Sequence, residues 1–303
     1  MKKVFVTGGN GFLGKFLVKY FKDKFVLHYP NSIECNLTKL ENLEKFNTIK
    51  YDYIFHLAAW TQAGDFCLKH PSEQWVINQY INTNIINWWQ NQQSQAKLIT
   101  IGTSCSYSDK YELIEENYLK GEPIESLYTY AMTKRMLHNG LVAAEKQYKL
   151  NWLCFVPSTL YGPNYHEDGR QMHFIFDLVR KITTAKKTGE KVTLWGNGFQ
   201  KREIVYVSDF LNAFEKLLEK NNEIINIGSG REYSIKEFAS MICKIINFEE
   251  QNIIYDENKY VGAKSKILNI NKLLSYLPNY SSQQKNINEG LKELVYWFNS
   301  NGK

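Results

Sequence analysis

Short apolar runs, separated by longer amphipathic stretches, organise most of this chain. The runs are rich in β-branched and aromatic residues and lie at 4–6, 25–29, 53–59, 98–102, 152–156, 204–207 and 224–228. Between them, apolar residues recur at helical spacing after 14, from about 73 to 92 and from 129 to 146. Such runs predict buried strands, and the amphipathic stretches predict helices. Strands that alternate with helices indicate an α/β fold built on a doubly wound parallel sheet.

The pattern changes in two parts of the chain. From about 165 to 200 the alternation of strands and helices lapses, and from 231 to 303 we expect mostly helix. Neither a low-complexity linker nor an internal repeat separates these parts. The chain is long enough to form one large α/β domain or two lobes.

Three glycines, Gly8, Gly11 and Gly14, follow the first apolar run. Glycine admits positive φ and lets a pyrophosphate approach the backbone without a Cβ in the way. The helix expected to follow would offer free N–H groups and the positive end of its dipole to the phosphates. The GxxGxxG spacing therefore predicts a dinucleotide-binding turn, and an ordinary glycine-rich strand–helix turn is the alternative.

The end of the second predicted strand bears on which nicotinamide cofactor is bound. An acidic residue there binds the 2′-hydroxyl of NAD, and an arginine accommodates the 2′-phosphate of NADP. This chain has neither: His28, Tyr29 and Asn31 stand there, and Asn10 stands in the glycine turn. Because no guanidinium is present to neutralise a phosphate, we expect NAD(H) to be favoured over NADP(H).

A hydroxyl, a phenol and an ammonium form the candidate catalytic group. Tyr130 and Lys134 lie four residues apart in a predicted helix and therefore share one face. A nearby ammonium and an oxidised nicotinamide both favour the phenolate of a tyrosine. Tyr130 could then exchange a proton with a secondary alcohol or its ketone while hydride moves. Thr103, after the fourth predicted strand, would orient the substrate oxygen, and Lys134 could also hold the nicotinamide ribose.

Together these features resemble the extended short-chain dehydrogenase/reductase family. The resemblance covers essentially the whole chain and rests on 7–14, on 56–59, on Thr103 with Tyr107, on Tyr130 with Lys134 and on 161–163. It implies that Thr103, Tyr130 and Lys134 are catalytic. It also implies a Rossmann domain over 1–163 plus about 203–228, and a smaller lobe over about 164–202 and 229–303 that binds a nucleotide-activated sugar.

The resemblance further implies cofactor contacts and a homodimer. The cofactor positions are Gly8, Asn10, Gly11, Phe12, Leu13, Gly14, His28, Asn36, Leu37, Leu57, Ala58, Ala59, Asn78, Pro157 and Leu160. The small residues Ala58 and Ala59 would leave room for a ligand at the end of their strand. Within the same run, His56 is expected to be a core histidine. Family members pair through two long helices, here about 80–95 and 129–149.

Within the family, the chain is most similar to the GDP-fucose synthases, which act on GDP-4-keto-6-deoxymannose. Cys105 and His173 fall where such an enzyme keeps its epimerisation base and acid. Thr159, Trp195 and Arg202 fall at positions that hold the nucleotide sugar, although an asparagine is usual in place of Thr159. The alternative interpretations are a buried strand-end residue for Cys105 and a helix-surface residue for His173.

These comparisons lead to one preferred function and several alternatives. We expect an NAD(H)-dependent oxidoreductase acting at C4 of a GDP-linked manno-configured hexose or heptose, as a dehydrogenase or a 4-keto reductase in surface polysaccharide synthesis. A GDP-fucose synthase-type 3,5-epimerase/4-reductase is the first alternative, and a UDP- or dTDP-sugar 4-epimerase or reductase is the second. A non-catalytic dinucleotide sensor is the remaining alternative. The 4,6-dehydratases look excluded, because Ser104-Cys105 replaces their acidic pair.

Composition and charge exclude several other classes. The formal charge of +6 comes from scattered lysines rather than a dense basic stripe, which argues against nucleic-acid binding. No apolar run approaches the roughly 20 residues of a membrane span, and no secretory cleavage site follows the first residues, so we expect a cytoplasmic protein. Five cysteines without a CxxC pair indicate reduced thiols, with neither disulfide nor metal site.

Overall fold

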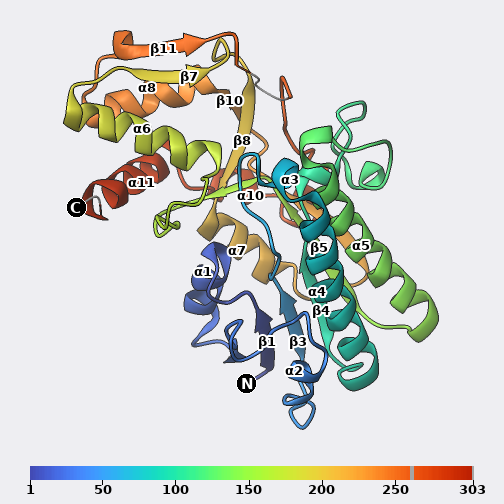
Figure 1. The fold of residues 1–303 in the computed structure, drawn as a ribbon. Helices are drawn as coiled ribbons and strands as arrows, with labels where there is room; N and C mark the ends of the chain where they lie inside the picture. The colour runs from blue at the N-terminus through green and yellow to red at the C-terminus, as the bar shows by residue number, and fades with distance from the viewer. Residues whose placement is uncertain (260–262, 302–303) are drawn as a thin grey trace. The chain divides into compact units, whose positions relative to one another are not determined.

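The computed structural model describes residues 1–259 and 263–301, and the chain divides into two compact units. The first unit comprises 1–157 and 211–227, and the second comprises 158–210 and 228–303. The two are described separately below, and Figure 1 gives the labels of their elements.

The first unit is built on a six-stranded sheet in the order β2-β1-β3-β4-β5-β9, with every neighbouring pair parallel. Its strands are β1 Lys3–Thr7, β2 Val26–His28, β3 Tyr53–His56, β4 Lys97–Ile101, β5 Trp152–Pro157 and β9 Glu223–Ile227. From the central pair of β1 and β3, the sheet extends to β2 on one side and to β4, β5 and β9 on the other, as in a doubly wound sheet. The expected α/β class and parallel sheet are confirmed.

Helices cover both faces of this sheet (Figure 1). They are α1 Phe12–Phe21, α2 Glu41–Glu44, α3 Phe66–Lys69, α4 Pro71–Gln92 and α5 Tyr128–Tyr148, and α7 Val207–Lys216 enters the unit at 211. Successive residues of a strand point to opposite faces. Phe5 of β1 therefore packs on Trp88 of α4, with ring centroids 4.9 Å apart, whereas Phe55 of β3 packs on Phe214 of α7 at 5.0 Å.

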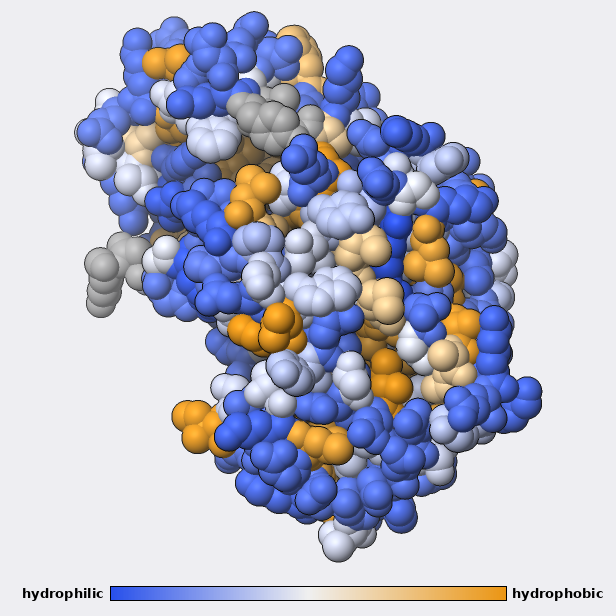
Figure 2. Space-filling view, turned by 45° about the vertical axis from the view of Figure 1, so that its right-hand side comes forward, coloured by the Kyte–Doolittle hydropathy of each residue, from blue (hydrophilic) through white to orange (hydrophobic). Residues whose placement is uncertain are grey.

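The core of the first unit follows from this alternation. Phe5, Phe55 and Phe214 are fully buried, and Trp88 is almost so. Burying a side chain of this kind contributes about 1.5–3 kcal/mol relative to leaving it exposed. Hydrophilic residues cover most of the face drawn in Figure 2, with hydrophobic residues in small groups between them.

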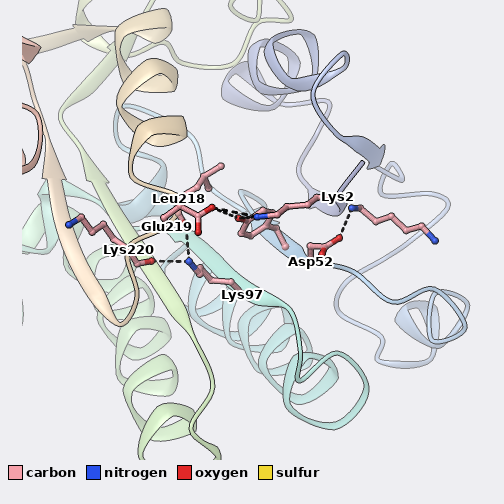
Figure 3. Close-up of polar contacts among 8 residues, drawn as sticks. Lys2, Asp52, Lys97, Leu218, Glu219 and Lys220 are labelled. Carbon is pink, nitrogen blue, oxygen red and sulfur yellow. Dashed lines mark hydrogen bonds and ion pairs between the residues drawn. The ribbon is translucent and has the colours of Figure 1, made fainter.

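Polar contacts occupy the edge of the sheet where β1, β3 and β4 begin (Figure 3). The ammonium of Lys97 donates to the carbonyl oxygens of Leu218 and Lys220 at 2.6 and 3.0 Å. Lys2 donates to the hydroxyl of Tyr53 at 2.8 Å and forms an exposed ion pair with Glu219. These contacts hold the segment that leads into β9, so this edge is structural. The opposite edge, at the carboxyl ends of the strands, is where ligands bind in such sheets.

The second unit contains two small sheets and a group of helices. Its strands are β6 Thr159–Tyr161, β7 Val192–Trp195, β8 Lys201–Tyr206, β10 Glu232–Ser234 and β11 Ile253–Asp256. One sheet has the order β10-β8-β6, and the other pairs β11 with β7. Its helices are α6 Phe174–Thr188, α8 Ile235–Ile246, α9 Asn271–Tyr276, α10 Tyr280–Gln283 and α11 Ile287–Asn301. In Figure 1, α6, α8 and α11 lie together.

The structure differs from the sequence-based expectation mainly in this unit. The run at 204–207 was expected as a further strand in the alternating pattern, but it lies in β8 of the small sheet and not in the large one. The short strands β7, β10 and β11 interrupt parts that were expected to be irregular or helical. Of the helices in the described ranges, none is long and apolar enough to cross a lipid bilayer.

Candidate active site

The glycine turn joins β1 to α1 and leaves no room for side chains. Gly8 has φ of +72°, in the left-handed region that favours glycine, and its carbonyl accepts the amide of Gly11 at 3.0 Å. A Cβ on Gly14 would lie 2.1 Å from the carbonyl oxygen of Gly8. A Cβ on Gly8 would lie 2.8 Å from the amide nitrogen of Ala58, after β3. The main chain of the turn therefore packs directly against the main chain at the end of β3, with no room for a side chain at Gly8.

The first turn of α1 fits a phosphate-binding role. Gly11 is the N-cap residue, and no side chain caps the helix. No acidic residue stands in the first turn. The first N–H groups of a helix lack intrahelical partners, and the helix dipole favours an anion beside them. A dinucleotide pyrophosphate fits this arrangement, because the glycines let it approach the main chain.

His56, at the end of β3, belongs to a buried polar network. Its Nδ1 lies 2.8 Å from Thr7 Oγ1, and its Nε2 lies 3.3 Å from Asn82 Oδ1. Because Asn82 uses its amide nitrogen to donate to the carbonyl of Thr133, its Oδ1 is left to accept from Nε2–H. Burial, followed by the charge of Lys134, lowers the pKa of His56 to about 3. His56 is a neutral core histidine, as expected.

Thr103 lies between β4 and a short 3₁₀ turn, η1 Ser104–Ser106. Its Oγ1 accepts the amide of Cys105 at 3.2 Å and so caps this turn. A hydroxyl that accepts through a lone pair keeps its own proton to donate. The side chain of Thr103 acts on Tyr130 and lowers the pKa of its phenol. Thr103 therefore lies near Tyr130, and the catalytic role of both residues stays a prediction.

Lys134 anchors α5 to the end of β4. Its ammonium donates to the carbonyl oxygen of Ile101 at 2.8 Å, and the side chain is only 5% exposed. Burial lowers the pKa of this lysine to about 8, because the charged form loses its hydration. The ammonium stays largely protonated at neutral pH and lies one helical turn from Tyr130.

Tyr130 is half-buried on the first turn of α5. Burial is the main influence on its pKa, which lies above its ordinary value, and the neighbouring thiols Cys105 and Cys67 raise it further. The side chain of Thr103 works in the opposite direction. Lys134, which was expected to favour the phenolate together with an oxidised nicotinamide, is not among the influences on this pKa. The phenol is protonated at neutral pH, which is the form that can donate a proton to a ketone oxygen.

The cysteines are all reduced, and Cys105 is the least buried of them. Cys35, Cys67, Cys154 and Cys243 are buried, whereas Cys105 is intermediate. The alternative of a fully buried strand-end residue therefore does not hold for Cys105. Within the described ranges, no group of three or more His, Cys, Asp and Glu side chains is arranged to hold a metal ion.

His173 lies in the second unit as the N-cap residue of α6. The residue is exposed at the protein surface.

The other predicted substrate residues also lie in the second unit. Thr159 and Arg202 stand on neighbouring strands, β6 and β8, and Arg202 donates to the carbonyl oxygen of Ala263 at 2.8 Å. Trp195 ends β7 and is 57% exposed. Their role in binding a nucleotide sugar stays a prediction.

A family model describes the first three quarters of the chain. The model of the NAD dependent epimerase/dehydratase family matches residues 4–228, from β1 to the end of β9. This chain belongs to that family. The resemblance drawn from the sequence motifs is therefore confirmed at the level of the family.

Relatives within the NAD dependent epimerase/dehydratase family include enzymes named for GDP-sugars. A GDP-L-fucose synthase from Dictyostelium discoideum is 29% identical, with 99% of this chain and 96% of the relative covered. A GDP-L-colitose synthase from Yersinia pseudotuberculosis is 28% identical, with 90% and 91% covered. A solved GDP-L-fucose synthetase from Naegleria fowleri, bound to NADP, superposes with a TM-score of 0.89 at 25% identity, covering 99% of this chain and 95% of that one.

The cofactor expectation is corrected by this family comparison. NAD(H) was expected to be favoured because no arginine follows β2, but the structurally similar GDP-L-fucose synthetase binds NADP. The physical error lies in treating a guanidinium as necessary. Main-chain N–H groups and neutral side-chain donors also bind phosphate oxygens. This chain has two asparagines with neutral side-chain donors in this region, Asn10 in the glycine turn and Asn31 after β2.

The remaining predicted cofactor residues are distributed over both units. His28 Nδ1 lies 2.7 Å from the hydroxyl of Tyr51. Asn78 is buried on α4 and bonds both the amide and the carbonyl of Trp60, so it shapes the loop after β3. Asn36, Leu37, Leu57, Ala58, Ala59 and Pro157 lie in the first unit, and Leu160 lies in the second. Their cofactor contacts stay predictions.

The sequence analysis missed Tyr118, which is fully buried beneath Thr103. Its hydroxyl accepts the amide of Thr103 at 3.4 Å, and a Cβ on Gly102 would lie 2.8 Å from that oxygen. Tyr118 follows η2 Glu115–Asn117 in a stretch with no periodic pattern. The one signal in the sequence is Gly102, since a glycine at the end of a strand can indicate that another group packs closely against it.

We predict that Gly14→Ala weakens nicotinamide-cofactor binding at least roughly tenfold, because the new Cβ would displace the turn that approaches the phosphates. Calorimetric titration with NADPH measures the effect. Gly140→Ala is the matched control, because a Cβ on this α5 residue meets only the flexible end of Ile86. Equal affinities in the two variants would contradict the role of the turn.

We predict that Tyr130→Phe lowers turnover at least roughly 10²-fold, the lower end for general acid–base catalysis, while the cofactor still binds. Tyr148→Phe, at the far end of α5, is the control because its side chain is exposed. The assay follows nicotinamide absorbance with a GDP-4-keto sugar. Turnover within a few-fold of the unmodified enzyme would show that Tyr130 is not the acid.

Proposed function

We propose that this protein transfers a hydride between NADP(H) and C4 of a GDP-linked sugar, with Tyr130 as the proton donor or acceptor. The observation that carries the proposal is the half-buried Tyr130, one helical turn from Lys134, whose ammonium donates to the carbonyl of Ile101 just before Thr103. The names of the relatives, GDP-L-fucose synthase and GDP-L-colitose synthase, support the GDP-sugar part. The NADP-bound relative supports the choice of cofactor.

In the proposed reaction, the chain positions both reactants and moves one proton. A nicotinamide cofactor supplies the hydride when bound. The main chain at Gly8–Gly14 would hold the pyrophosphate, and Lys134 would hold the nicotinamide ribose. Thr103 would orient the C4 oxygen by a hydrogen bond. Tyr130 would then give its proton to this oxygen during reduction.

The state of Tyr130 favours reduction over oxidation as the ready direction. Burial keeps the phenol protonated, so donation to a developing alkoxide needs no prior ionisation. Oxidation needs the phenolate, which the positive charge of an oxidised nicotinamide would help to stabilise. We therefore propose a 4-keto reductase, acting on a GDP-linked manno-configured hexose or heptose in polysaccharide synthesis.

Epimerisation at C3 or C5 is the second candidate activity. It needs a base and an acid on opposite faces of the carbon next to the ketone. Cys105 supports it, because its thiol is the least buried of the cysteines and influences the pKa of Tyr130. His173, in contrast, is exposed at the start of α6. We therefore rank reduction alone above the epimerase-reductase.

A homodimer formed through α4 and α5 belongs to the same proposal. Trp75, Val76 and Tyr80 on α4 and Met136 on α5 are large apolar side chains, each more than a third exposed. A second copy of the chain would remove such surface from water. Light scattering of the purified protein measures its mass directly.

The substrate class is tested with purified protein, NADPH and a panel of nucleotide sugars. We expect NADPH oxidation with a GDP-4-keto-6-deoxymannose or a GDP-4-keto heptose, and none with the matching dTDP- or UDP-4-keto sugars. Faster turnover of a dTDP- or UDP-sugar would reject the GDP assignment. No turnover with any member of the panel would reject the oxidoreductase.

Deuterium exchange separates reduction from epimerisation. We predict that Cys105→Ser and His173→Gln leave turnover at C4 largely intact, because hydride transfer requires neither side chain. The assay incubates the enzyme with a GDP-4-keto sugar in deuterated water and locates the label by NMR. Deuterium at C3 or C5 that disappears in Cys105→Ser would establish the epimerase-reductase instead.

A further inference from the structure

Arg135 directly follows Lys134 on α5 and is buried, with 6% of its surface exposed. Its guanidinium donates to four main-chain carbonyl oxygens in two separate segments of the first unit. The carbonyl of Ser106 accepts from Nε at 2.9 Å and from Nη2 at 2.5 Å, that of Lys120 accepts from Nη2 at 3.0 Å, and those of Gly121 and Leu119 accept from Nη1 at 2.6 and 3.4 Å. A planar fork of five donors is needed to satisfy so many acceptors at once.

The first segment that Arg135 holds carries Thr103. Lys134 bonds the carbonyl of Ile101, just before Thr103, and Arg135 bonds the carbonyl of Ser106, just after it. Ser106 also donates its hydroxyl to the carbonyl of Ala131, on the same helix, at 3.2 Å. Lys134 and Arg135 therefore bond the main chain on both sides of Thr103. Both side chains extend from α5, the helix that also carries Tyr130.

The second segment that Arg135 holds carries Tyr118. The carbonyls of Lys120 and Gly121 receive its two terminal nitrogens, and Gly121 has φ of +61°. Tyr118 is fully buried, and its hydroxyl accepts the amide of Thr103. The guanidinium thus joins the two segments that meet at Thr103.

We propose that Arg135 is a positioning residue that sets the distance between the Thr103 hydroxyl and the Tyr130 phenol. The catalytic part of this proposal rests on the proposed function, because the proton concerned is the one given to the C4 oxygen. Lysine cannot replace arginine in this role, because one ammonium cannot span both segments. The competing explanation is that Arg135 only stabilises the fold.

Thiol labelling tests the positioning without any substrate. Cys105 lies between Thr103 and Ser106, in the segment that Arg135 holds. Cys154 is buried in β5, so its labelling reports unfolding of the whole unit. The folded protein is treated with N-ethylmaleimide, and the labelled peptides are quantified by mass spectrometry over time. The variants are Arg135→Met and Arg135→Lys. The lysine variant keeps the positive charge, and it serves alone if the methionine variant does not fold. Arg180→Met, which removes a surface ion pair on α6, is the control.

We expect Cys105 to react several-fold faster in both Arg135 variants and unchanged in Arg180→Met, with Cys154 protected throughout. An unchanged rate at Cys105 would overturn the proposal. Cys154 reacting faster in parallel with Cys105 would also overturn it, since Arg135 would then be a general stabiliser.

Kinetics test the catalytic part. A displacement of about 1 Å at a catalytic group can cost on the order of 10²-fold, so we expect kcat to fall between about tenfold and 10²-fold. The KM for the sugar and the affinity for NADPH should change little. The isotope effect from 4-deuterated NADPH should rise as the chemical step becomes limiting. A parallel loss in KM and NADPH affinity, with no change in isotope effect, would reject catalytic positioning.

The two proposals can fail separately. If the unmodified enzyme reduces no 4-keto sugar, but Cys105 still reacts faster in the Arg135 variants, the proposed function is rejected. The claim that Arg135 holds the Thr103 segment is then still supported. If the enzyme reduces the sugar and both Arg135 variants match it in kcat, the proposed function stands and the positioning role is rejected.

Discussion

The hydrogen bond from the Lys134 ammonium to the carbonyl oxygen of Ile101 is the contact on which the candidate site depends. It joins the helix that carries Tyr130 to the strand that leads into Thr103, and the hydroxyl of Ser106, which donates to the carbonyl of Ala131, adds a further hydrogen bond between this helix and the Thr103 segment. Burying an ammonium is unfavourable unless its donors are satisfied, and the lowered pKa of Lys134 reflects that cost. The helix is therefore held in the one register that gives the charge a strong acceptor, and this register places Tyr130 beside Thr103.

The same principle extends to the groups around Lys134. His56 stays neutral because its ring is buried and lies near the ammonium, and both its nitrogens have partners, so the second polar network adds no charge to the core. Arg135 puts a second cation one residue further along α5, with main-chain carbonyls rather than a carboxylate as its partners. Carbonyl oxygens stabilise a cation without bringing a titratable group into the site.

Features with a local cause could be predicted from the sequence. The glycine turn follows from steric limits at Gly8 and Gly14, the parallel strands follow from apolar runs, and the shared face of Tyr130 and Lys134 follows from helical spacing. The features that were missed depend on contacts between distant segments. Tyr118 and Arg135 act through main-chain atoms, which leave no residue pattern to read. The run at 204–207 has the composition of a central strand, but β8 pairs instead with β6 and β10, because short strands are assigned to a sheet by tertiary packing.

The cofactor error and the state of Tyr130 have the same origin. Both expectations relied on full charges: an arginine for the 2′-phosphate, and an ammonium together with an oxidised nicotinamide for the phenol. In the structure, the largest influence on the pKa of Tyr130 is burial, and the side chain of Thr103 opposes it. Desolvation acts on every ionisable group in a site, whereas a formal charge is weakened when it is engaged elsewhere, as Lys134 is by Ile101. A phenol kept protonated by burial is in the form that can donate a proton to a substrate oxygen on which charge develops.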